Sequence, residues 1–276
     1  MPSAARHVVV GLGRWGGWLA YRLDDCGLGP ERVVARGKAV AAEVGGYYDC
    51  AHSTDLTLRA AGLTSDHVVW VCLPDDALAG WVARFAEAHP HSTGPEPLVV
   101  IASGGTPLSP LSAVYARVGA AWPVQSITAE REPDWSTLPF VVQTARAGDE
   151  ERLRDLCRRL GGGRADVVAG DGRRLTAHLG AVLVQNFVNL LWREAADLLA
   201  TAGLDYRVLL PLAEAHLGAL AEHPPGEQQT GPAARGDLST QASHLALLDR
   251  LGSSELAALY RDLSGRIARL EASGGR

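Results

Sequence analysis

Residues 7–23, HVVVGLGRWGGWLAYRL, constrain the fold of this chain more than any other segment. A short run of β-branched residues meets three closely spaced glycines, and apolar residues then recur at helical spacing. This order predicts a strand, a tight turn and a helix. A glycine turn lets the backbone approach a pyrophosphate, whose charge lies on the free N–H groups of the helix N-terminus. The expected dinucleotide contacts in this segment are Gly11, Gly13, Arg14, Trp15 and Gly16.

Composition and charge exclude several classes of partner. The net charge of -5 and the pI of about 6.0 argue against nucleic acids and anionic membranes, which clustered Lys and Arg side chains bind. No secretory signal precedes the first strand, and no apolar run approaches the roughly 20 residues of a membrane span. The four cysteines form no CxxC pair and have no metal-ligand spacing with histidine. We therefore expect reduced thiols, no metal site and a cytoplasmic protein.

The end of the second strand, residues 31–35, predicts the choice of cofactor. NAD sites usually place an acid here, which bonds the ribose 2′-hydroxyl, whereas an arginine accommodates the 2′-phosphate of NADP. This chain has Arg36 and Lys38 instead of an acid, which favours NADP over NAD. The alternative is that both are solvated loop cations. Lys38 is also the only lysine of the chain, so a mechanism that requires a lysine elsewhere is excluded.

Strands and helices alternate through the first 170 residues. Strands are expected over 67–73, 98–102, 120–127, 138–144 and 165–169, and this alternation is typical of a doubly wound sheet. Ligands collect at the carboxyl ends of such strands, where a nicotinamide is expected to lie. The further cofactor contacts are therefore Leu73, Pro74, Ser103 and Gly104. The acids after Pro74 suit a helix N-terminus and are interpreted as structural.

The second part of the chain is predicted to be entirely helical. Helices are expected over residues 173–202, 204–223, 238–251 and 255–271, with a loop rich in Pro and Gly over 224–236. The fold class is therefore α/β, a Rossmann-type doubly wound sheet followed by an all-helical C-terminal domain. We place the dinucleotide-binding domain at residues 1–170 and the substrate or dimerisation domain at residues 171–276.

Polar side chains interrupt the apolar stretch LGAVLVQNFVNLL of the first long helix. At 100° per residue they share one face. The stretch contains Gln185, Asn186 and Asn189, and His178 and Arg193 lie on the same face on either side of it. In a buried helix such a stripe requires hydrogen-bond partners, because an unpaired buried polar group costs about 1–3 kcal/mol. The partner is either a substrate, or another helix or subunit, and the pattern leaves both open.

The loop QTGPAARGD is the second polar concentration. Asp237 can cap the helix that follows, which places Thr240 and His244 on one face of it. Arg235 either binds a carboxylate of a substrate or pairs with Asp237. His178 and His244 are the candidate proton donors because imidazole titrates near neutral pH, and the alternative for each is a structural histidine.

Six segments together resemble one family: GLGRWG at Gly11, the turn at Arg36, VCLPDDAL at Val71, SGG at Ser103, HLGAVLVQN at His178, and TGPAARGDLSTQASHLALL from Thr230. Over almost its whole length the chain resembles the Rossmann-like NADP oxidoreductases that carry an uncharacterised helical C-terminal domain. These are distant relatives of pyrroline-5-carboxylate reductase and of the 6-phosphogluconate and hydroxyisobutyrate dehydrogenases. The resemblance implies a cofactor domain, a helical domain packed against it, and a homodimer built through the helices.

Two positions depart from these relatives. Val182 stands where the dehydrogenases have a catalytic lysine, four residues before the helix asparagine. Trp122 precedes Pro123 where family members often have a histidine. The proton-transfer chemistry of the relatives therefore does not carry over directly.

The sequence predicts an NADP-dependent oxidoreductase that passes hydride between the nicotinamide and a small C=N or C=O substrate in the interdomain cleft. His178 or His244 is expected to donate the proton, and Asn186 to orient the substrate. The expected substrate contacts are Asn189, Arg235, Asp237 and Thr240, with Arg235 binding an anionic group. The alternative is a dinucleotide-binding sensor or scaffold protein without catalysis.

Overall fold

The computed structural model of the chain describes residues 5–59, 61–89 and 96–274. The chain forms two compact units, Met1–Asn186 and Phe187–Arg276, and each is described by itself. The sequence places the domain boundary at residue 170, where a long helix begins, whereas the two units divide inside that helix. The first unit therefore contains the sheet together with the first part of the helix, residues 171–186.

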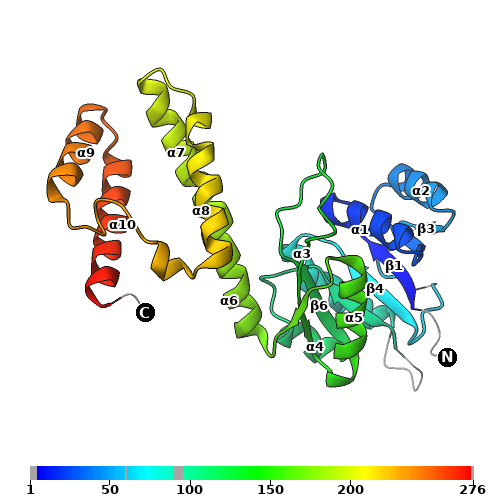
Figure 1. The fold of residues 1–276 in the computed structure, drawn as a ribbon. Coiled ribbons are helices and arrows are strands. Elements are labelled where there is room, and N and C mark those ends of the chain that lie inside the picture. The colour runs from blue at the N-terminus through cyan, green and yellow to red at the C-terminus, as the bar shows by residue number, and fades with distance from the viewer. Residues whose placement is uncertain (1–4, 60, 90–95, 275–276) are drawn as a thin grey trace. The chain divides into compact units, whose positions relative to one another are not determined.

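An eight-stranded sheet organises the first unit, in the order β3-β2-β1-β4-β5-β6-β7-β8 (Figure 1). Neighbouring strands are parallel except for β6 and β7, which pair antiparallel. The strands are β1 Arg6–Val10, β2 Pro30–Val34, β3 Ala51–Ser53, β4 His67–Val71, β5 Leu98–Ile101, β6 Val118–Pro123, β7 Phe140–Thr144 and β8 Ala165–Val167. This order confirms the predicted doubly wound fold.

Helices cover both faces of the sheet. Alternate residues of β1, β4 and β5 face opposite sides of the sheet and are buried in two separate hydrophobic clusters. One cluster includes residues of α1 and α5, and the other includes residues of α3 and α4. Strands buried on both faces read as continuous apolar runs, which explains sequences such as HVVWV in β4. The helices of this part are α1 Arg14–Asp25, α2 Lys38–Tyr47, α3 Asp75–Ala88, α4 Ser109–Val114 and α5 Glu150–Leu160.

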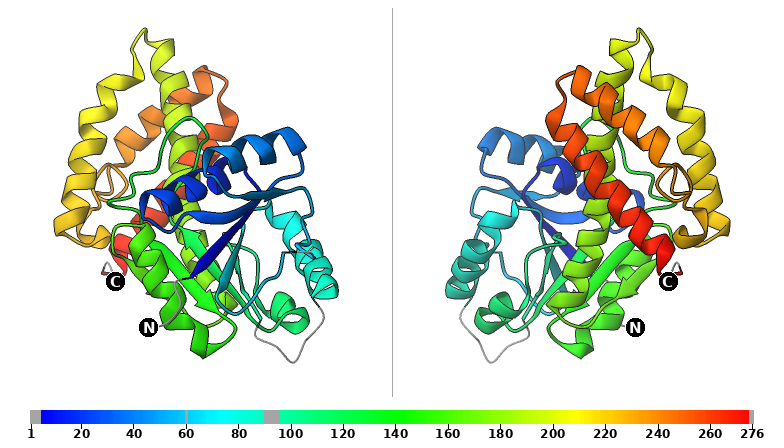
Figure 2. Two further views of the ribbon diagram at one scale, coloured as in Figure 1. Left: turned by 90° about the vertical axis from the view of Figure 1, so that its right-hand side faces the viewer. Right: turned by 90° about the vertical axis from the view of Figure 1, so that its left-hand side faces the viewer.

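The remaining helices confirm the predicted all-helical second part (Figures 1 and 2). Within the second unit, α9 and α10 pack side by side. The α-helices are α6 Asp171–Ala181, α7 Val188–Thr201, α8 Leu210–Glu222, α9 Leu238–Arg250 and α10 Ser254–Ala272. A π-helical segment, Val182–Phe187, joins α6 to α7, and short 3-10 turns cover Tyr206–Leu209 and Pro225–Gln228.

One strand is shorter than its sequence predicts. The apolar run over 120–127 predicts a strand to Ile127, but β6 ends at Pro123. The chain turns there, because the Gln125 N–H donates to the carbonyl of Pro123 at 2.9 Å, a three-residue turn of the γ type. Residues 124–139 instead form a long connection to β7.

The later turns of the long helix are not covered within their own unit, where the polar stripe predicts a buried helix. No residue of the π segment or of α7 is buried by the elements of its own unit. The helical run Asp171–Thr201 is long enough to cross a membrane, with a mean hydropathy of 1.2 over 18 residues and none of that window buried. One helix of this kind is weak evidence for a membrane span.

Candidate functional site

The glycine turn lies between β1 and α1. Gly11 has φ +90°, and a Cβ added there would lie 2.7 Å from the carbonyl oxygen of Cys72. A Cβ on Gly16 would lie 1.8 Å from the carbonyl oxygen of Gly11. A Cβ on Gly13 meets nothing within 4 Å. Gly11 and Gly16 are therefore required by the fold itself, whereas Gly13 borders open space.

The N-terminus of α1 suits an anionic ligand. Its first turn contains no acidic residue, and no side chain caps it, so its N–H groups and the helix dipole are available. Arg14 is exposed at the first helical position. The side chain of Trp15 packs against Trp135 and Phe140, with ring centroids 5.8 and 6.1 Å away. Any ligand contact of Trp15 is thus limited to its backbone, and the open turn at Gly13 fits a dinucleotide pyrophosphate.

Two cations follow β2. Arg36 and Lys38 are exposed on either side of Gly37, the N-cap residue of α2. The first turn of α2 contains no acidic residue. This strand end therefore offers positive charge and no carboxylate, as a 2′-phosphate requires.

The carboxyl ends of β4 and β5 lie beside the glycine turn, because β1, β4 and β5 are parallel neighbours. Leu73 and Pro74 follow β4, and Pro74 is the N-cap residue of α3. Ser103 follows β5, and its Oγ accepts from the N–H groups of Gly105 and Thr106 at 3.2 and 2.9 Å. These strand ends carry the four predicted residues Leu73, Pro74, Ser103 and Gly104, which therefore share one edge of the sheet with the glycine turn.

His178 packs directly on this edge. A Cβ on Gly104 would lie 2.5 Å from Cδ2 of His178 and 2.8 Å from the indole of Trp122. The His178 and Trp122 rings themselves meet edge to face, with centroids 5.2 Å apart. A side chain at residue 104 would separate the loop from both rings, so the contact requires glycine. The imidazole of α6 is thereby held against the loop that follows β5.

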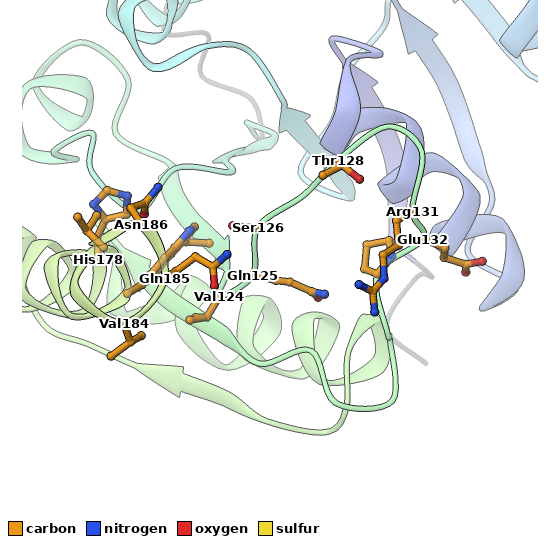
Figure 3. Close-up of a pocket in the computed structure, with 14 residues that line it drawn as sticks. Val124, Gln125, Ser126, Thr128, Arg131, Glu132, His178, Val184, Gln185 and Asn186 are labelled. Atoms are coloured by element: carbon orange, nitrogen blue, oxygen red, sulfur yellow. The ribbon is translucent and has the colours of Figure 1, made fainter. Parts of the chain in front are cut away.

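A cavity of about 610 Å³ opens beside His178 (Figure 3). The helix contributes His178, Gln185 and Asn186 on one side, and the β6–β7 connection forms the other (Figure 3). The full lining is Trp122, Val124, Gln125, Ser126, Thr128, Arg131, Glu132, Pro133, His178, Ala181, Val182, Val184, Gln185 and Asn186. The cavity is half-open and mixes amide, hydroxyl and charged groups with apolar walls, as sites for small polar molecules do.

Tryptophan side chains hold the β6–β7 connection, residues 124–139, against α1. Nε1 of Trp18 in α1 donates to the carbonyl of Thr128 at 2.8 Å. Trp135 packs on Trp15, and Arg22 lies over its ring, 5.4 Å from the centroid. Since α1 also carries the glycine turn, this wall of the cavity is tied to the predicted cofactor site.

The polar stripe is divided between the two units. His178, Gln185 and Asn186 belong to the first unit and line the cavity, while Asn189 and Arg193 belong to the second. The π-helical segment widens the turn between these groups, so the spacing of 100° per residue does not hold across it. Such segments are frequent at functional sites.

The polar loop of the second unit behaves partly as predicted. Asp237 caps α9 by accepting from the N–H of Thr240 at 3.0 Å, and the Thr240 hydroxyl donates to the same carboxylate at 2.6 Å. These bonds lower the pKa of Asp237 to about 2. Arg235 is exposed, and His244 shares a 2.9 Å hydrogen bond with the hydroxyl of Tyr260. Asp237 and Thr240 are thus occupied with the cap, while Arg235 remains accessible.

His244 lies on a second, apolar cavity of about 290 Å³. Its wall is made by α7, α9 and α10, with Leu191, Leu198 and Leu248 among the lining residues. His178 and His244, the two candidate proton donors, therefore belong to different cavities in different units. Only His178 shares a cavity with Asn186.

The described residues form neither a metal site nor a disulfide. The described residues contain no group of three or more His, Cys, Asp or Glu side chains that could hold a metal ion. All four cysteines are free, and burial raises the pKa of the Cys72 and Cys157 thiols. Cys72 and Cys157 both pack in the hydrophobic cluster between the sheet and helices α1 and α5.

Comparison with known proteins places these features in a family. Residues 138–267 match the family described as a domain of unknown function, DUF2520. A crystal structure from Bacteroides fragilis, described as a candidate NADP oxidoreductase, is 26% identical, covers 96% of this chain and 98% of its own, and has a TM-score of 0.76. Residues 138–267 are thus similar to DUF2520, and the chain has the fold of the Rossmann-like NADP oxidoreductases.

More distant structures share the fold of this chain. A Streptomyces aurantiacus imine reductase is 15% identical, with a TM-score of 0.67, and covers 98% of this chain and 95% of its own. A pyrroline-5-carboxylate reductase from Coxiella burnetii is 12% identical, with a TM-score of 0.59, and covers 99% and 100%. No curated protein matches the sequence.

The two cavities also have lining residues that the sequence motifs do not reveal. Gln125, Ser126 and Arg131 line the first cavity, and Tyr260 lines the second. The first two fall in a segment whose apolar pattern predicts a strand, and Tyr260 carries no motif. The Trp-Pro pair before the segment is the one signal that the strand ends early.

Proposed function

We propose that this chain is an NADPH-dependent oxidoreductase that reduces a small C=N or C=O substrate in the cavity beside His178. The observation that carries the proposal is the packing of His178 on Gly104, at the sheet edge that also holds the glycine turn. The candidate NADP oxidoreductase of B. fragilis and the imine reductase support the same class of reaction. When bound, the nicotinamide supplies the hydride that adds to the substrate carbon.

The residues of the chain have separate roles in this proposal. His178 donates a proton to the substrate nitrogen or oxygen as the carbon accepts the hydride, which balances the reduction. The side-chain amide of Asn186 orients the substrate. Val182 lines the cavity where the dehydrogenase relatives have lysine, so His178 is the protonable group of the helical wall.

Turnover of NADPH tests the proposal. Purified protein is mixed with NADPH and a panel of cyclic imines, keto acids, and keto acids paired with amines, and the loss of NADPH absorbance is followed. Substrate-dependent oxidation is expected with at least one class. Tight NADPH binding without turnover across the panel would instead identify a dinucleotide sensor, a function that Val182 in place of the lysine favours.

Replacement of Arg36 by aspartate is expected to lower the affinity for NADPH relative to NADH by at least about tenfold, or about 1.4 kcal/mol. The carboxylate would repel the 2′-phosphate and accept from a ribose 2′-hydroxyl instead. Fluorescence titration with both cofactors measures the ratio. Arg158→Asp on α5 makes the same change of charge elsewhere and serves as the control. An unchanged ratio in Arg36→Asp would mean that this strand end does not select the cofactor.

We further propose a homodimer built through the helical unit. Among the described residues 187–274, the buried apolar residues are few: Ala233, Leu248 and Ala257. Large side chains of α8 are exposed instead, with Leu212 at 71% and Leu217 at 67%. Exposed apolar patches of this kind mark interfaces. A second copy of the chain would cover these side chains. We also propose a cytoplasmic location.

Light scattering after gel filtration is expected to give the mass of two chains. Replacing both Leu212 and Leu217 by glutamate should shift the mass towards one chain, because each charge would have to be buried in the interface. Val40→Glu on α2 of the first unit is the control. A wild-type protein that elutes as a monomer at micromolar concentration would refute the dimer.

A further inference from the structure

A fully buried arginine lies one helical turn before His178. Arg174 of α6 is 1% exposed. Its Nε donates to Oε1 of Gln143 at 2.8 Å, and Nη1 donates to the carbonyl of Ser103 at 2.5 Å. Nη2 donates to the carbonyl of Thr106. One guanidinium thus holds two carbonyls of the loop that follows β5, as only its planar fork of donors can.

Asp171 holds the other end of the same loop. Its carboxylate accepts from the N–H groups of Leu108 and Ser109 at 2.7 and 3.0 Å, and from Nε2 of Gln143 at 3.0 Å. These hydrogen bonds lower its pKa to about 2. Nη2 of Arg174 lies 3.7 Å from the same carboxylate. Gln143 of β7 therefore bridges the two charged side chains, and α6 is fixed to the loop at both ends of residues 103–109.

The loop that this network fixes is the one that His178 contacts. Residues 174 and 178 are separated by one turn and share a face of α6. Arg174 binds the carbonyls of Ser103 and Thr106, while His178 packs against Gly104 between them. The hydrogen bonds of Arg174 therefore set the distance between the His178 imidazole and the loop.

We propose that Arg174, with Asp171 and Gln143, is a positioning residue that fixes His178 relative to the loop at Ser103–Thr106. It does not touch the cofactor or the substrate. This inference rests on the proposed function for its effect on turnover, but its effect on the loop is independent of any reaction. When a catalytic group is mispositioned, kcat falls more than the binding affinity does, because alignment matters most in the transition state.

Arg174→Lys tests the proposal, since lysine keeps the charge and lacks the fork. We expect kcat to fall at least tenfold, while KM and the dissociation constant of NADPH change less than about threefold. Hydrogen exchange of the peptide that covers residues 103–109 should become at least tenfold faster. Gln143→Met, which leaves the two carbonyl bonds of Arg174 in place, should change both quantities in the same direction by a smaller factor and provides a test if Arg174→Lys does not fold.

Arg117→Lys is the matched control. Arg117 precedes β6, so it lies at the opposite end of the strand from Pro123, and it also binds carbonyls, those of Ser65 and Glu96, as well as Asp149. Its replacement should lower the melting temperature without slowing turnover per folded molecule. Unchanged exchange of residues 103–109 in both Arg174→Lys and Gln143→Met would overturn the positioning role. A wild-type protein without turnover would refute the proposed function alone, because the exchange result still decides the role of Arg174.

Discussion

Replacement of His178 by glutamine is expected to lower kcat by about 10²–10⁴-fold, the usual contribution of a positioned general acid. Glutamine retains much of the volume that packs on Gly104 and Trp122, but it cannot release a proton near neutral pH. KM and NADPH affinity should change little, since the lost interaction belongs to the transition state. Steady-state kinetics and a fluorescence titration of NADPH measure the two effects.

Two other histidines make this prediction specific. His244→Gln removes the partner of Tyr260 in the apolar cavity of the second unit, and His223→Gln removes an exposed histidine 3.8 Å from Glu227. We expect His223→Gln to be as active as wild type. A lower kcat in His244→Gln but not in His178→Gln would identify His244 of the second unit as the proton donor. Full activity in both variants would exclude either histidine as the donor.

The fold could be predicted from the sequence because its signals are local. The apolar runs of β1, β4 and β5 and the glycine turn before α1 each lie within one short segment, and each indicates one element. The prediction was wrong where a local pattern continued past a structural break. The run that includes β6 extends to Ile127, yet the chain turns after Pro123.

The candidate site was predictable only in part, for a related reason. His178 and Asn186 stand out as polar residues in an apolar helix, and their type and spacing suffice to single them out. The pairing of His178 with Gly104 joins residues far apart in the chain, and neither residue type indicates its partner. Arg174 is one of 25 arginines, and nothing in its neighbourhood distinguishes a buried guanidinium from a solvated one.

The burial of the long helix could not be predicted from its composition. Its apolar residues indicate a covered surface but not whether that cover comes from the same chain. In the structure the π segment and α7 contain no buried residue, so the neighbouring elements of the same unit do not supply the cover. Composition is therefore consistent with the proposed second copy, which the mass in solution tests.

Gly13→Ala and Gly16→Ala lie in the same turn but are expected to have different effects. Gly13→Ala should weaken NADPH binding at unchanged stability, whereas Gly16→Ala should lower the stability of the fold. The Cβ of Gly13→Ala meets no protein atom within 4 Å, so the melting temperature should stay within about 2 °C of wild type. The same methyl group occupies the space through which a pyrophosphate approaches the backbone. NADPH affinity should therefore fall at least about tenfold, measured by fluorescence titration.

Gly16→Ala places a Cβ 1.8 Å from the carbonyl oxygen of Gly11, a backbone atom that cannot move without shifting α1. A loss of about 3 kcal/mol, the upper end for overpacking, lowers the melting temperature by roughly 6–12 °C in a domain of this size. Gly17→Ala is the control, because its Cβ also meets nothing within 4 Å and it lies inside the helix. If Gly13→Ala bound NADPH as wild type does, the open space at the turn would not be the pyrophosphate site, and the cofactor would have to bind elsewhere on the sheet edge.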